Sequence, residues 1–180
     1  MPDKRRIMGA SFSDEAEDFS ASLDPFDHLK TVKDLDFKRF TGGWWVMAHH
    51  PNEWEDGCQR SSREVTYISG ILNIKNVCWR VGQKSKELDQ VMSIPDSSDK
   101  GKMKATFVQE KIEHRLWVHD TDYINYALVG DPKHHKMWIW TRQEKVDDKL
   151  IPKFMNLVAE YGYNPGQLMV DSKSTILSKP

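Results

Sequence analysis

The stretch Phe40-Thr41-Gly42-Gly43-Trp44-Trp45-Val46-Met47-Ala48 decides how the rest of the chain folds. Gly42 and Gly43 lack a Cβ, so the backbone can turn sharply there and approach other segments closely. Trp44 then places a large apolar ring at the start of an apolar run. The pattern predicts a strand over residues 44–49 that begins at a tightly packed end of the molecule.

Seven more strands are expected from alternating apolar and polar residues bounded by turn residues. Ser69-Gly70 is predicted as a tight hairpin turn, and residues 50–57 as a loop marked by Pro51 and Gly57. No helical pattern separates the strands, which favours an antiparallel up-and-down β-barrel of eight strands over a parallel sheet. The seven expected strands are residues 59–68, 71–81, 88–94, 102–109, 113–119, 123–130 and 136–142.

Beyond the strands the apolar spacing changes to three and four residues, which predicts one amphipathic α-helix packed outside the barrel. Asp147 or Asp148 can cap its N-terminus, Pro152 is tolerated only near that start, and Gly162 fits its C-terminal end. A short helix over residues 34–40 and a short ninth strand over residues 168–170 are also expected. The apolar face of the long helix is expected to comprise Leu150, Ile151, Phe154, Met155, Leu157, Val158 and Tyr161.

The domain organisation follows from these patterns. Residues 1–33 are polar and acidic and are expected to form an N-terminal arm, residues 34–171 the barrel with its helix, and residues 172–180 a C-terminal tail. A chain of 180 residues is most simply one such domain.

Charge and hydropathy exclude some classes of partner. The chain has 26 Lys and Arg against 27 Asp and Glu, a net charge of -1, which argues against a nucleic-acid partner because such partners need a clustered positive field. No apolar run has the length of a transmembrane segment, and peripheral membrane or protein-complex association stays open. The charged N-terminus leads into no apolar stretch, so no signal peptide is visible. The chain as written is expected to be cytoplasmic, or secreted or plastid-located if a leader has been removed.

Three stretches in this order resemble the lipocalin family, in particular its branch of bacterial, plant and apolipoprotein-D-like members. They are the opening stretch, Thr121-Asp122-Tyr123-Ile124-Asn125-Tyr126-Ala127-Leu128-Val129, and Trp138-Ile139-Trp140-Thr141-Arg142. The resemblance implies that Gly42, Trp44 and Arg142 have a structural role, in which the arginine crosses the tryptophan and closes one end of the barrel. A guanidinium over an indole is worth roughly 0.5–2 kcal/mol, and its other donors can satisfy carbonyls near Phe40.

If the Arg142 side chain lies on the inward face of its strand, the alternation of side chains along each strand predicts which other residues face the barrel interior. Large inward apolar residues do not distinguish a filled barrel from a hollow one, and the resemblance favours a hollow calyx. Trp54, in the loop over the expected open end, is either a lid that contacts ligand or a ring folded back on the rim. The expected ligand-binding residues are Trp54, Gln90, Met92, Ile94, Met103, Ala105, Phe107, Leu116, Val118, Tyr126, Trp138 and Trp140.

The implied function is to bind and carry a small hydrophobic ligand in the calyx. The resemblance suggests a fatty acid, lysolipid, sterol, retinoid, carotenoid or bilin, with no cofactor required beyond such a bound lipid or pigment. Apolar burial at ~25 cal/mol per Å² would supply most of the affinity.

Two alternatives are kept. Asp56-Gly57-Cys58-Gln59, with Asn76-Val77-Cys78-Trp79-Arg80, is similar to the lipocalin domain of violaxanthin de-epoxidases. In a xanthophyll-modifying enzyme of that kind Asp56 would be the candidate catalytic acid, whereas a solvated loop carboxylate is its plainer interpretation. The other alternative is a ligand-free structural subunit of a larger, for example photosynthetic, complex.

Cysteines and histidines complete the candidate chemistry. The expected hairpin register places Cys58 opposite Val81 and Cys78 opposite Ser61, which is beyond disulfide reach and favours free thiols. The adjacent pairs His49-His50 and His134-His135 point to opposite faces of a strand, and metal-binding spacings are absent from the sequence. We therefore expect no metal site, and an axial ligand from His49 or His119 to a haem-like tetrapyrrole is kept as the alternative.

Overall fold

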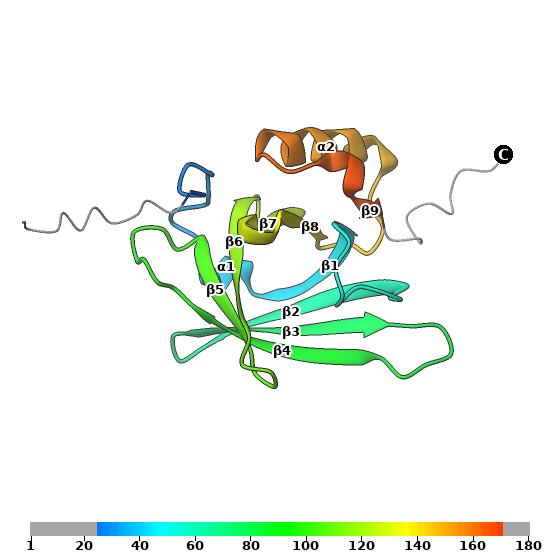
Figure 1. Ribbon diagram of the computed structural model, residues 1–180, viewed down its shortest axis with the longest axis horizontal. Helices are drawn as coiled ribbons and strands as arrows, with labels where there is room; N and C mark the ends of the chain where they lie inside the picture. Colours follow the sequence, from blue (N-terminus) through cyan, green and yellow to red (C-terminus); the bar gives the residue numbers. More distant parts are fainter. Residues whose placement is uncertain (1–24, 171–180) are drawn as a thin grey trace, which may run out of the picture.

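The computed structural model describes residues 25–170. Its strands form one antiparallel sheet that closes on itself, because β1 pairs with β8 along one edge and with β2 along the other. The predicted eight-stranded up-and-down barrel is confirmed (Figure 1). The strands are β1 (Gly42–His49), β2 (Arg60–Ile68), β3 (Ile71–Trp79), β4 (Lys86–Ser93), β5 (Lys102–Phe107), β6 (Glu113–Thr121), β7 (Tyr126–Asp131), β8 (Lys136–Thr141) and the short β9 (Met169–Val170).

The helices lie at the end and on the outside of the barrel. The one-turn helix α1 (Phe37–Phe40) precedes β1, and the Asp36 carboxylate caps its N-terminus. Helix α2 (Ile151–Glu160), preceded by the 3-10 turn η2 (Asp148–Leu150), lies over β7 and β8 (Figure 1). Two further 3-10 turns are η1 (Pro132–His134) and η3 (Pro165–Gln167).

The barrel wall separates two apolar clusters. The interior cluster contains Trp44, Met103, Val118 and Trp140, and the outer cluster joins the wall to α2 through Phe154 and Val158. The predicted apolar face of α2 is thus partly right, but Leu150 is 40% exposed because it belongs to η2, before the helix begins.

One end of the barrel is closed by the stretch that opens β1. The guanidinium carbon of Arg142 lies 3.5 Å from the centroid of the Trp44 ring, and the Trp44 indole N–H donates to the Phe40 carbonyl at 3.0 Å. Gly42 has φ +97°, a conformation that favours glycine. Arg142 also donates hydrogen bonds to the carbonyls of Arg39, Gly43 and Tyr123.

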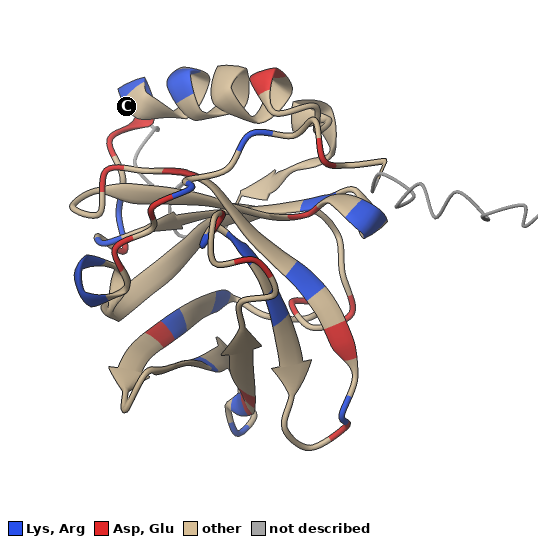
Figure 2. Ribbon diagram, turned by 90° about the vertical axis from the view of Figure 1, so that its left-hand side faces the viewer, with Lys and Arg blue, Asp and Glu red and all other residues tan. Residues whose placement is uncertain are grey.

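The described part of the expected N-terminal arm packs on the barrel. The Val32 amide donates to the Val118 carbonyl, and the Thr31 hydroxyl donates to Asp99. Residues 1–24 of the arm and the tail 172–180 lie outside the described residues. Acidic and basic residues are interspersed along the visible strands and loops (Figure 2). Among residues 25–170, no helix is long and apolar enough to cross a membrane.

Candidate functional site

The open end of the barrel lies opposite the closed end, where β1 leads into the loop of residues 50–58. A hollow of about 440 Å³ is formed there between this loop and the ends of β4, β5 and β6. We call it the mouth. Its apolar lining is Trp54, Leu88, Phe107, Ile112 and Trp138, and its polar and charged lining is Asn52, Glu53, Lys86, Glu110, His114, Asp131, His134 and Lys136.

A second, smaller space of about 40 Å³ lies inside the barrel, and we call it the inner cavity. It shares Trp54, Leu88, Phe107, His114 and Trp138 with the mouth, so these side chains border both spaces. Ligand pockets usually measure about 300–1,000 Å³. The hollow calyx that the resemblance implies is therefore mostly filled by side chains, and of these two spaces the mouth is the one of ligand size.

Three polar side chains form a hydrogen-bonded chain across the inner cavity. The Asn76 amide donates to the Gln90 side-chain oxygen at 3.0 Å, and the Gln90 amide nitrogen lies 2.7 Å from Nε2 of His114. The His114 ring stacks on Phe107 with centroids 4.9 Å apart, and its Nδ1 lies 3.7 Å from a carboxylate oxygen of Asp131. A fully bonded polar chain of this kind fixes side-chain positions in an otherwise apolar interior.

A buried ion pair lies beside this chain. Glu55, 3% exposed, reaches into the barrel and forms an ion pair with Arg63 of β2. The Trp138 indole N–H donates to its other oxygen at 3.3 Å. Burial alone raises the pKa of Glu55, but the Arg63 guanidinium, His49 and the two hydrogen bonds outweigh it, so the pKa lies below its usual value. The pair is therefore charged at neutral pH, and it holds the loop inward.

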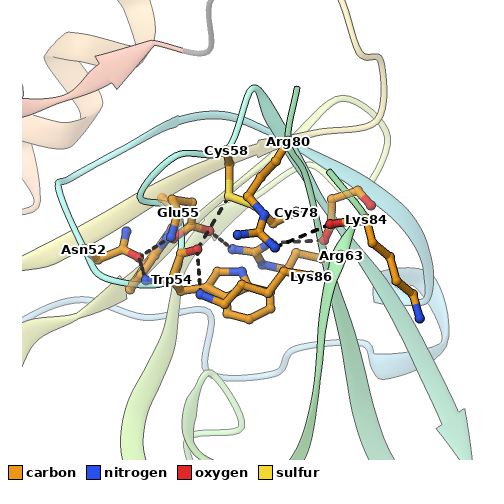
Figure 3. Close-up of a disulfide and its surroundings, with 11 residues drawn as sticks. Asn52, Trp54, Glu55, Cys58, Arg63, Cys78, Arg80, Lys84 and Lys86 are labelled. Atoms are coloured by element: carbon orange, nitrogen blue, oxygen red, sulfur yellow. Dashed lines mark hydrogen bonds and ion pairs between the residues drawn. A yellow bond between two sulfur atoms is a disulfide. The ribbon is translucent and has the colours of Figure 1, made fainter. Parts of the chain in front are cut away.

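The same loop is fastened a second time by a disulfide between Cys58 and Cys78 (Figure 3). The expectation of free thiols was wrong, although Ser61 does pair with Cys78 as predicted. Cys58 lies before β2 begins, and its amide donates to the Glu55 carbonyl, so the loop curls back. The two Cα atoms are therefore 5.4 Å apart, within the usual disulfide range.

Trp54 directly precedes Glu55 in the loop and lines both the mouth and the inner cavity. Asn52 accepts hydrogen bonds from the amides of Trp54 and Glu55, both at 3.0 Å. The Lys86 ammonium lies 4.3 Å from the centroid of the Trp54 ring and 3.4 Å from its carbonyl oxygen (Figure 3). The ring is thus folded onto the rim and lines the inner cavity, whereas its role as a lid that contacts ligand stays a prediction.

Six of the twelve residues expected to bind ligand line the inner cavity. They are Trp54, Gln90, Phe107, Leu116, Trp138 and Trp140. Five others pack in the interior cluster without lining a described cavity, namely Met92, Ile94, Met103, Ala105 and Val118. Ligand contact by any of the twelve stays a prediction.

Tyr126 does not face the interior, so the expectation that its hydroxyl serves the calyx was wrong. Its ring packs on Phe154 of α2 with centroids 5.4 Å apart, and its hydroxyl donates to Asp120 at 3.0 Å. Ala127 and Val129 occupy the inward positions of β7. Burial and the nearby Asp120 carboxylate raise the Tyr126 pKa well above its usual value, so the hydroxyl stays protonated.

Asp56, the candidate acid of the enzyme alternative, also lies outside the interior. It is exposed and lines a separate hollow of about 560 Å³ between the loop and β9, which Lys136 and Met169 border as well. Within the described residues, no group of three or more His, Cys, Asp or Glu is placed to hold a metal ion.

Several inward polar residues were missed in the sequence, namely Glu55, Arg63, Asn76 and His114. Period two over residues 59–68 does place Arg63 on the same face as Ser61 and Val65, both buried. The alternation of buried residues could therefore have predicted that Arg63 faces inward. Glu55 carried no comparable signal because it belongs to a loop.

A family model described as a lipocalin-like domain matches residues 35–173. Temperature-induced lipocalin-1 of Arabidopsis thaliana is 23% identical over 150 residues, covering 78% of this chain and 80% of that protein. The outer membrane lipoprotein Blc of Vibrio cholerae is 21% identical over 146 residues, covering 79% of this chain and 85% of that protein. Insecticyanin from the tobacco hornworm Manduca sexta is similar in structure, with a TM-score of 0.65, 22% identity and coverage of 79% of this chain and 82% of that one.

The closed antiparallel barrel with one helix outside is the architecture of the lipocalin fold. Because the family model matches well over half of the chain, this protein belongs to the lipocalin-like family. The resemblance found in the sequence is confirmed.

Proposed function

We propose that this protein binds a small hydrophobic molecule reversibly at the mouth of its barrel. The observation that carries the proposal is the mouth itself, about 440 Å³ with five large apolar side chains, above a barrel whose other end is sealed. Such a hollow is of ligand size, and apolar surface buried in it contributes ~25 cal/mol per Å².

The charged residues around the mouth support an amphipathic or apolar ligand over a highly charged one. Lys86 and Lys136 are accompanied by Glu53, Glu110 and Asp131, so charges of both signs line the mouth. The rim also exposes apolar side chains, with Ile112 54% and Val108 50% exposed. Fatty acids, lysolipids, retinoids, carotenoids and bilins are the candidate classes, and the lining alone gives no ground to choose among them.

Two substitutions on β4 test the proposal, because neighbouring residues of a strand face opposite sides. Leu88→Glu places a charge in the mouth, whereas Val91→Glu places one on the outer wall, where Val91 is 38% exposed. A fatty acid carrying an environment-sensitive fluorophore should bind the wild-type protein saturably at one site. Leu88→Glu should weaken binding at least about tenfold, equivalent to about 1.4 kcal/mol, and Val91→Glu should leave it unchanged.

Non-saturable fluorescence with this probe, and no saturable binding of a lysolipid, a retinoid, a carotenoid or a bilin, would contradict the proposal. Equal weakening by both substitutions would also count against the mouth as the site. Circular dichroism of each variant checks that the barrel is intact.

A further inference from the structure

Two tryptophans that line the inner cavity, Trp140 and Trp54, have indole N–H groups without a hydrogen-bond partner among the described residues. Trp140 is only 2% exposed. The other inward indoles are satisfied, since Trp44 donates to the Phe40 carbonyl and Trp138 to Glu55. Because buried donors in folded proteins are nearly always bonded, the Trp140 N–H calls for an acceptor other than the described residues.

Acceptors of Gln90, His114 and Glu55 around the inner cavity are already engaged. The Asn76, Gln90 and His114 side chains bond to one another in sequence, and the Glu55 carboxylate is held by Arg63 and Trp138. The cavity of about 40 Å³ has room for one small group. A single oxygen atom at the end of a ligand fits such a space.

The charge of the inner cavity selects a neutral group. Among the described residues that line it, Arg63 and Glu55 carry full charges, and these two neutralise each other in one ion pair. A carboxylate entering the cavity would lose its hydration without gaining an unpaired cation, which is costly in an apolar interior. An uncharged carbonyl oxygen needs only a donor, and an indole N–H is a donor only.

We infer that the ligand of this protein is an apolar chain ending in an uncharged carbonyl group, a ketone or aldehyde, whose oxygen accepts a hydrogen bond from Nε1 of Trp140. The chain leads outward past Trp54 to the mouth, where Leu88, Phe107 and Trp138 contact it. This inference rests on the proposed function and adds the ligand class and its orientation, with the polar end inward.

Three molecules of equal chain length test this ligand class, 2-dodecanone, dodecane and dodecanoate, each measured by competition against the fluorescent fatty acid. The ketone should compete at a concentration at least about tenfold lower than either of the others, as a hydrogen bond to a buried donor predicts. In Trp140→Phe, which keeps a ring but removes the donor, the ketone's advantage over dodecane should disappear.

The matched control is Trp45→Phe. Trp45 packs on Trp79 of the outer wall, with ring centroids 5.6 Å apart, so the ketone's advantage should persist in that variant. A second measurement needs no substitution at Trp140. In ¹⁵N–¹H spectra of the wild-type protein, one indole N–H resonance should move to the hydrogen-bonded range on adding ketone and stay in place on adding dodecane.

Equal competition by ketone and dodecane, or tightest binding of dodecanoate, would overturn the inference while leaving the proposed function intact. An indole resonance already hydrogen-bonded in the free protein and unmoved by ketone would also overturn it, because a buried water would then hold the donor. Absence of saturable binding by the fluorescent probe and also by a lysolipid, a retinoid, a carotenoid and a bilin would instead remove the proposed function, and this inference with it.

Discussion

At the scale of single residues, Gly130 shows how closely the barrel wall is packed against the segment that follows α2. A Cβ built on Gly130 would lie 2.3 Å from the Tyr163 hydroxyl and 2.8 Å from Nε2 of His119. Those two atoms are themselves joined by a hydrogen bond of 2.9 Å. The glycine is therefore required for space, since its side of β7 meets a buried polar contact that has no room to move.

We expect Gly130→Ala to lower the free energy of unfolding by about 1–3 kcal/mol, because the methyl group must displace the Tyr163 hydroxyl or distort the strand. Urea unfolding followed by tryptophan fluorescence measures the change. Gly43→Ala is the matched control, since its Cβ would lie 3.4 Å from the end of the flexible Glu64 side chain. A loss in the control as large as in Gly130→Ala would contradict this account.

Single residues also show where prediction from sequence stopped. Trp44 and Arg142 could be paired in advance because a motif fixed both positions. Tyr126 could not be assigned to a face because β7 is covered on both sides, by the interior cluster and by α2. Apolar residues then occupy both faces, and the period of two no longer distinguishes them.

At the scale of elements, the strands were predictable because turn residues and alternation mark them locally. Their observed ends differ from the expected ones by three residues at most, as at the start of β7. The loop of residues 50–58 was recognised as a loop, but its path was not. Its inward turn depends on Arg63 and Cys78, which lie outside the loop, in β2 and β3. No local sequence pattern indicates that they pair with residues of the loop.

The disulfide should determine how rigidly this loop covers the mouth. In a Cys58→Ser/Cys78→Ser double variant we expect amide hydrogen exchange of residues 52–57 to accelerate, while that of β4 and β5 stays unchanged. The bridge closes a loop of 20 residues, so its loss should also cost about 3 kcal/mol of stability by the chain-entropy model.

Asp56→Asn is the control for that experiment, because Asp56 is exposed in the same loop and its substitution keeps the bridge. Exchange should be as slow in this variant as in the wild-type protein. Unchanged exchange in the double variant would show that the Glu55–Arg63 pair alone holds the loop.

At the scale of the whole molecule, His119 joins three separate parts of the chain. Its Nδ1–H donates to the Lys30 carbonyl at 2.7 Å, and its Nε2 accepts a hydrogen bond from the Tyr163 hydroxyl. The ring thus connects the N-terminal segment, the barrel and the segment after α2. Burial lowers the pKa of His119 from 6.5 to about 4, partly opposed by the bond to Lys30, so the ring is neutral at pH 7.

This burial predicts that stability falls as the pH falls. The unfolded chain takes up a proton near pH 6.5 and the folded protein only near pH 4, so His119's contribution is complete above 6.5 and is lost between 6.5 and about 4. The difference corresponds to about 3 kcal/mol. Urea unfolding at a series of pH values should show this dependence reduced in His119→Gln, whose amide can still accept from Tyr163.

His134→Gln is the control, because the His134 side chain is 52% exposed. Its pH dependence should match that of the wild-type protein. An equally steep fall in His119→Gln would show that other groups cause the loss of stability at low pH.

The closed end of the barrel has a consequence for how one bound ligand is replaced by another. Because Phe40, Trp44 and Arg142 close that end, a molecule bound at the mouth as proposed would have to leave by the same opening through which it entered. A second ligand could not enter through the closed end and displace the first one. The rate of ligand exchange would then equal the rate of spontaneous dissociation. A higher concentration of a competing ligand would fill the sites that become empty but would not speed up dissociation.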